Sequence, residues 1–259
     1  HDSHRRQRQM CIRDSIKIGD SGIVFPWIGC GKCEACLEDN ETLCEMPKYL
    51  GARLNGGYSD HIIVPDSKYI VSYGDMDPAQ AAPYACSGLT AFSALKKIPT
   101  TSKDDWIIII GAGGVGINGI LLSPATHKAK ILVIDNDPEK RKKAIEAGAN
   151  EAFSPDEETE IRNKIGIGAS AAIDFVGRPE TTDLGLSLVK KGGMVIVVGL
   201  YGGSLKLSLP LVPMRSMTLR GSYVGELREL KELVNIIKSG KIKLIPVKKQ
   251  GLETANQAM

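Results

Sequence analysis

The segment that most constrains the fold is Trp106–Leu122, which reads WIIIIGAGGVGINGILL. Its β-branched run predicts a buried strand, and the pattern that follows predicts a helix. Gly111, Gly113 and Gly116 lie between them with the spacing G-x-G-x-x-G. Alone this spacing is a weak signal, but between a strand and a helix it predicts a loop whose backbone approaches a pyrophosphate. The helix N-terminus would supply amide groups and the positive end of its dipole.

The next predicted strand, AKILVID, ends at Asp135, about 20 residues after the glycine loop. A carboxylate at that place accepts hydrogen bonds from a ribose 2′-hydroxyl and repels a 2′-phosphate, so NAD is favoured over NADP. The alternative is that Asp135 is only a turn residue ahead of Pro138. The glycine motif upstream favours ribose binding.

Strands and helices then alternate. Residues 171–177, 194–203 and 217–225 predict strands, whereas 138–148, 180–193 and 226–240 predict helices, each of which ends at a glycine. This alternation is typical of an α/β fold with a doubly wound parallel sheet, over residues 102–240. The first half differs, because short strands broken by Gly and Pro, including one over 58–65, precede a helical bridge at 77–97.

Four cysteines, Cys30, Cys33, Cys36 and Cys44, have the spacing C-x2-C-x2-C-x7-C. Thiolates at this spacing can surround one tetrahedral Zn2+, and such a closed site stabilises the fold without doing chemistry. An iron–sulfur cluster is the competing interpretation, but the ferredoxin pattern continues C-x3-C-P. Nothing in the sequence indicates secretion, so a disulfide framework is the weaker interpretation of these cysteines.

The 259 residues carry a formal net charge of +3, and the opening segment HDSHRRQRQMCIRDS contributes four Arg and two Asp. The remainder is nearly neutral, which argues against a nucleic-acid partner. No apolar run is long enough to span a membrane, and the start is not a secretory signal. Residues 1–15 are predicted to be a non-native tail, so Cys11 is not expected to be a metal ligand or a catalytic residue.

The four cysteines, ACSGLTA and GAGGVG, in this order along the chain, resemble the zinc-dependent medium-chain alcohol dehydrogenases over about Ile18–Met259. The resemblance implies a GroES-like catalytic domain around a Rossmann domain, and NAD-linked interconversion of alcohols with aldehydes or ketones. The expected parts are a partial GroES-like domain at 16–101, the Rossmann domain at 102–240 and a return to the catalytic domain at 241–259. It also implies a cytoplasmic homo-oligomer, dimer or tetramer, that acts on a small alcohol or carbonyl compound, with no nucleic-acid or membrane partner.

The resemblance also assigns residues. Four cysteines would hold the structural zinc, Cys86 would be one ligand of a catalytic zinc, and Trp27 would line the substrate pocket. Thr90 would pack against the nicotinamide, and Asp135 with Lys140 would bind the adenosine ribose. The remaining cofactor contacts would be the glycine loop and two later segments: Gly111, Gly113, Gly114, Val115, Gly116, Val198, Leu200, Ser222 and Val224.

The family's second cysteine ligand, its Gly-His-Glu segment and its proton-relay hydroxyl find no match, and the sequence stops at GLETANQAM before the family's closing strands. The chain is therefore expected to be truncated at both ends. His61 and His127 are interpreted as a strand and a loop residue rather than ligands. The chain is expected to bind NAD weakly and to oxidise alcohols poorly or not at all. The alternatives are a NAD-binding fragment without catalysis and, third, a zinc ribbon that binds nucleic acid.

Overall fold

The computed structural model describes residues 16–258. Its main feature is a six-stranded sheet with the order β5-β4-β3-β6-β7-β8, in which every neighbouring pair is parallel. The strands are β3 (Trp106–Ile110), β4 (Lys130–Ile134), β5 (Glu151–Phe153), β6 (Ala169–Asp174), β7 (Val189–Val197) and β8 (Thr218–Gly221). The predicted doubly wound sheet is confirmed, with β3 at its centre.

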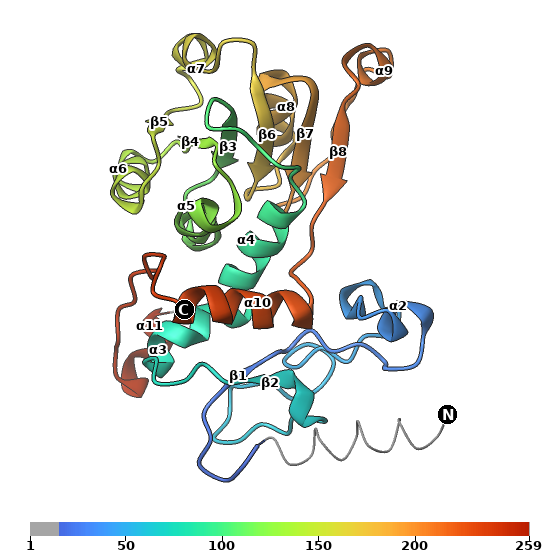
Figure 1. Cartoon of the computed structure of the whole chain (residues 1–259), viewed down its shortest axis with the longest axis vertical. Coiled ribbons are helices and arrows are strands. Elements are labelled where there is room, and N and C mark those ends of the chain that lie inside the picture. Colours follow the sequence, from blue (N-terminus) through green and yellow to red (C-terminus); the bar gives the residue numbers. More distant parts are fainter. Residues whose placement is uncertain (1–15, 259) are drawn as a thin grey trace.

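Helices cover both faces of this sheet because the side chains of β3 alternate between two apolar clusters. Ile107 and Ile109 join the cluster that includes α5 and α10, whereas Ile108 and Ile110 join the cluster that includes α7 and α8. The helices of this part, shown in Figure 1, are α5 (Gly114–Thr126), α6 (Pro138–Ala147), α7 (Glu158–Ile165), α8 (Pro179–Leu188), α9 (Leu211–Arg215) and α10 (Leu227–Lys238).

The N-terminal region has little regular structure among the described residues. Strands β1 (Ile23–Val24) and β2 (Ile70–Val71) pair antiparallel, and the segment that holds the four cysteines contains the short elements α2 (Glu34–Leu37) and η1 (Glu41–Leu43). Elements η2 (Ser67–Tyr69), α3 (Pro78–Ala81), η3 (Ala82–Ala85) and α4 (Ser87–Lys96) lead to the sheet, and η4 (Leu252–Thr254) with α11 (Ala255–Ala258) ends the chain. Figure 1 shows α2 beside the end of α10 that follows β8.

Three local predictions are wrong. The strand expected at 58–65, with His61 in it, is irregular and largely exposed, because no strand of the described residues pairs with it. The helix expected over 180–193 ends at Leu188, and Val189 begins β7 opposite Ala169. The last predicted strand ends at Gly221, so Ser222 and Val224 lie in the loop that follows.

The non-native tail predicted at 1–15 lies outside the described residues, and the domain boundaries stay predictions. Among residues 16–258 no helix is long and apolar enough to cross a membrane.

Candidate functional site

The glycine loop lies between β3 and α5, where its backbone is tightly folded. Gly111 has a φ of 92° and donates its N–H to Ile134 O at 2.9 Å. A Cβ on Gly116 would lie 1.9 Å from Gly111 O, so only glycine fits there. A Cβ on Gly113 or Gly114 would meet no atom within 4 Å among the described residues outside the immediate chain neighbours. The N-terminus of α5 is therefore open to a ligand at these two positions, and Val115 follows them half-buried.

Asp135 follows β4 and is bound to this loop by its side chain. Its Oδ2 accepts the Ala112 N–H at 2.7 Å, and its Oδ1 accepts the Asp137 N–H at 2.9 Å. A carboxylate offers about four lone-pair sites, so a ribose hydroxyl can still donate to the remaining ones. Lys140 is exposed in the first turn of α6, which Asp137 caps. The residues present fit an adenosine ribose here.

The other predicted cofactor contacts lie across the same edge of the sheet. Val198 and Leu200 follow β7, Ser222 and Val224 follow β8, and the Ser222 N–H donates to Val197 O at 2.9 Å. In doubly wound sheets, ligands bind outside the carboxyl ends of the strands. With the adenosine half at β4, the nicotinamide half of a dinucleotide would lie over β6 to β8.

Asp174, at the end of β6, is a residue that the sequence interpretation missed. It is fully buried, and its carboxylate accepts hydrogen bonds from Val176 N, Gly177 N, Thr181 Oγ1 and Thr182 Oγ1 at 2.7–2.9 Å. Its carbonyl accepts the Val198 N–H at 2.9 Å. Asp174 thereby fixes the loop after β7. An acidic residue at the end of an apolar strand was the available signal.

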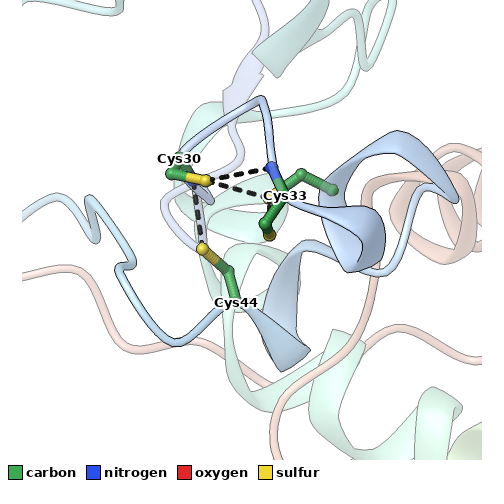
Figure 2. A group of neighbouring side chains, drawn as sticks. Cys30, Cys33 and Cys44 are labelled. Atoms are coloured by element: carbon green, nitrogen blue, oxygen red, sulfur yellow. Dashed lines mark hydrogen bonds between the residues drawn. The ribbon is translucent and has the colours of Figure 1, made fainter.

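The four cysteine thiols converge on one point, as Figure 2 shows for Cys30, Cys33 and Cys44. All four Sγ atoms lie within 4.8 Å of one another, with 3.5 Å between Cys33 and Cys36 and 4.0 Å between Cys30 and Cys36. Sulfurs around a tetrahedral zinc, each about 2.3 Å from it, have similar separations. The four residues therefore fit one zinc.

Two of these thiols differ in acidity. Backbone N–H groups of Lys32 and Cys33 lower the pKa of Cys30 to about 6, whereas desolvation raises the pKa of Cys36 to about 12. Zinc binds thiolates, so loading the site would release protons. Gly29 is needed beside Cys36, because a Cβ there would lie 2.4 Å from its Sγ.

A buried carboxylate supports the cysteine lobe, which we define as residues 29–44. Glu41 is 4% exposed and accepts hydrogen bonds from Gly29 N at 2.7 Å, Tyr69 Oη at 2.8 Å and Lys68 Nζ at 3.2 Å. Burial and the hydrogen bond with Glu41 raise the pKa of Tyr69, which keeps its hydroxyl a donor. Glu41 thus connects the start of the lobe to η2.

Cys86 and Thr90 lie one turn apart at the start of α4, with Thr90 N donating to Cys86 O at 2.8 Å. Cys86 is exposed, yet neighbouring atoms desolvate its sulfur enough to raise the thiol pKa. Trp27 lies close by, because its indole N–H donates to Ala85 O at 3.1 Å. Its ring contacts Tyr49 and Tyr223 edge-on, at centroid distances of 5.5 and 5.9 Å.

Within residues 16–258, the four cysteines form the only group of three or more His, Cys, Asp or Glu that could hold a metal. Cys86 belongs to no such group, so the described residues do not fit a second, catalytic zinc. His61 is exposed, and the His127 ring binds Leu95 O at 2.9 Å.

Comparisons with known proteins agree with this geometry. Residues 11–74 match the alcohol dehydrogenase GroES-like domain, and residues 114–239 match the zinc-binding dehydrogenase domain. The NAD-dependent alcohol dehydrogenase of Sulfolobus acidocaldarius is 35% identical over 250 residues, which are 95% of this chain and 72% of that protein. The chain belongs to the zinc-dependent medium-chain alcohol dehydrogenase family. The predicted family is confirmed, and so are the predicted fold class and the cofactors NAD and zinc.

Other relatives show how the family varies. The alcohol dehydrogenase of Aeropyrum pernix has a TM-score of 0.86 at 28% identity, over 95% of this chain and 73% of that one. The D-arabinose 1-dehydrogenase (NADP(+)) of Saccharolobus solfataricus is 33% identical, over 88% of this chain and 67% of that protein. Relatives of similar identity therefore differ in the substrate and cofactor that their names give. The roles of individual site residues in this chain stay predictions.

Proposed function

We propose that this chain binds NAD across the carboxyl edge of its sheet and serves hydride transfer between a small alcohol and the corresponding aldehyde or ketone. The observation that carries the proposal is the glycine loop joined to Asp135 on one side of β3, with Val198 and Ser222 on the other. Bound NAD supplies the hydride acceptor, and the protein supplies its position.

Each part of the edge has a distinct task. The α5 N-terminus at Gly113 and Gly114 binds the pyrophosphate through backbone N–H groups and the helix dipole. Asp135 accepts hydrogen bonds from the adenosine ribose, and Lys140 adds a positive charge beside it. Val198 and Leu200 offer backbone groups to the carboxamide, while Thr90 and Val115 pack against the nicotinamide ring.

We place the substrate near Cys86, where Trp27, Tyr49 and Tyr223 supply an aromatic wall. Such a wall favours alcohols with an apolar chain or ring, because burying apolar surface stabilises their binding. Cys86 is the residue here that matches the family's catalytic zinc ligands. The four-cysteine zinc stabilises the lobe and takes no part in the reaction.

The test is alcohol-dependent NADH formation by protein that carries this chain, across a panel of primary, secondary and aromatic alcohols. Cys86→Ser should abolish the reaction but leave NAD binding unchanged, because Cys86 acts on the substrate side. NADH formation that survives Cys86→Ser would contradict this role. Strongly salt-dependent DNA binding would instead support the zinc-ribbon alternative.

We further propose that the protein forms a homo-oligomer and works in the cytoplasm, where cysteine ligands stay reduced. The edge strand β8 supports assembly, because all four of its residues are exposed, and Leu219 is 45% exposed. An exposed edge strand presents unpaired backbone N–H and C=O groups, through which it can pair with another chain. Light scattering should show a dimer or tetramer, and Leu219→Lys should shift it toward the monomer; a monomeric unmodified protein would contradict assembly.

A further inference from the structure

The loop after β8 combines two features that the fold alone does not require. Val224 is buried and has a φ of 43°, a conformation that β-branched residues rarely adopt. The Ser222 hydroxyl is also buried and has no hydrogen-bond partner among the described residues. Strained backbone and unpaired buried groups concentrate at functional sites. We call Ser222–Glu226 the junction loop.

The junction loop is joined to the cysteine lobe, which is remote in sequence. Thr42 donates its hydroxyl to Glu226 Oε1 and its N–H to the same carboxylate at 3.3 Å. Next to this contact, Arg228 Nη2 donates to Asn40 Oδ1 at 3.0 Å. Glu226 is only 8% exposed, so its hydrogen bonds are shielded from competing water.

The two ends of this contact are both restrained. Thr42 lies in η1, between the buried Glu41 and the zinc ligand Cys44. On the other side, Gly225 packs so closely on α4 that a Cβ there would lie 2.8 Å from Leu89 Cδ1. Glu226 therefore fixes the junction loop between the cysteine lobe and the helix that carries Thr90.

We infer that Glu226, through Thr42, is a positioning residue that couples the cysteine lobe to the loop seating the nicotinamide half of NAD. The inference rests on the proposed function, because it needs NAD at this edge. The cysteine lobe then has a second task besides its own stability. It sets the position of Ser222 and Val224.

A competing role for Glu226 is purely structural, because it also lies at the start of α10, where its N–H donates to Glu229 Oε2 at 2.9 Å. The two roles are separable in the chain. Thr42→Val removes the hydroxyl that reaches Glu226 and leaves the helix start intact. Glu229→Ala removes the acceptor at the helix start and leaves Thr42 intact.

The experiment is calorimetric titration of the zinc-loaded protein with NAD and with ADP-ribose, which lacks the nicotinamide. Thr42→Val and Glu226→Gln should each weaken NAD binding about tenfold, or about 1.4 kcal/mol, and leave ADP-ribose binding unchanged. Thr42→Ser, which keeps the hydroxyl, should restore NAD affinity. Glu229→Ala should bind both ligands as the unmodified protein does.

Either of two results would overturn the inference without contradicting the proposed function. One is that Thr42→Val loses equal affinity for NAD and ADP-ribose, and the other is that its NAD affinity is unchanged. If Glu226→Gln fails to fold, Thr42→Val and Thr42→Ser decide. If the unmodified protein binds neither ligand, the proposed function is wrong, and the inference is wrong with it.

Discussion

The part of the chain that forms the six-stranded sheet, which we call the nucleotide domain, and the N-terminal region are each stabilised by a different kind of interaction. The nucleotide domain has six strands joined by backbone hydrogen bonds, and Ile107, Ile108 and Ile109 at its centre are 0% exposed. The described N-terminal region has two strands of two residues each. Beside them, Phe25 and Ile28 join the apolar cluster of the sheet, whereas the cysteine lobe is ordered by four thiols and the Glu41 carboxylate. The sheet therefore depends on a repeating pattern of apolar residues, whereas the cysteine lobe depends on a few specific side chains.

This difference implies different responses to damage. Each substitution in the central parallel sheet should lower the free energy of unfolding by a limited amount, since each buried apolar side chain contributes about 1.5–3 kcal/mol. The cysteine lobe depends on a few strong contacts, so loss of one of them should disorder a whole segment. The predictions below test this contrast.

The largest effect is expected from removal of zinc. A strong chelator, or Cys44→Ser, should remove a metal whose binding contributes on the order of 10 kcal/mol in small zinc domains. Hydrogen exchange measured by mass spectrometry should show loss of protection over the cysteine lobe and β2, with β3, β4 and β6 still protected. Equal loss in both regions would show that they are not independently held. Iron with visible charge-transfer absorption would contradict zinc.

A second large effect is expected within the nucleotide domain, at Gly116. Gly116→Ala should force the glycine loop away from Gly111 O and lower NAD affinity at least about 100-fold, or about 3 kcal/mol. Thermal melting should also show a lower Tm. Gly114→Ala is the matched control: its Cβ has free space, so the Tm should be unchanged even though NAD binding falls. A Gly116→Ala variant that binds NAD normally would contradict the loop geometry.

An intermediate effect is expected at Glu41. Glu41→Gln leaves an acceptor but removes the charge that Gly29, Lys68 and Tyr69 contact. Loss of such charged hydrogen bonds in a buried place costs about 1–3 kcal/mol. The loss should appear in urea unfolding followed by Trp27 fluorescence in a Trp106→Phe background. Full stability in Glu41→Gln would mean that the metal alone orders the lobe.

The same contrast decides what the sequence could predict. The sheet follows from periodicity and from the glycine spacing, which depend on neighbouring residues only. The thiol convergence follows from spacing as well. Glu226 and Thr42 act through a contact that is distant in sequence, so no local pattern indicates them. Asp174 did have a local signal, an acidic residue at the end of an apolar strand, but periodicity alone does not assign it a role. The strand expected at 58–65 failed for a related reason, because alternation does not supply a partner strand.

The smallest effect is expected at the amino ends of the strands, opposite the carboxyl ends where NAD is proposed to bind. There Lys190 Nζ lies 2.8 Å from Asp105 Oδ1. Lys190 and Ser170 hold the pKa of the Asp105 carboxyl well below its usual range. A lowered folded-state pKa stabilises the protein above the unfolded pKa of about 4, and the contribution is lost as the pH falls below it. Asp105→Asn should therefore cost about 1 kcal/mol at neutral pH and less in acid. A cost that does not shrink with acidification would contradict the ion pair.

The most direct test of the central claim, that NAD lies across this edge with its adenosine ribose at Asp135, is titration of the unmodified protein with NAD and NADP. NAD should bind at least about tenfold more tightly, because the buried Asp135 carboxylate repels a 2′-phosphate. Asp135→Asn, which removes that charge, should narrow the difference. Equal affinity of the unmodified protein for the two cofactors would contradict the claim.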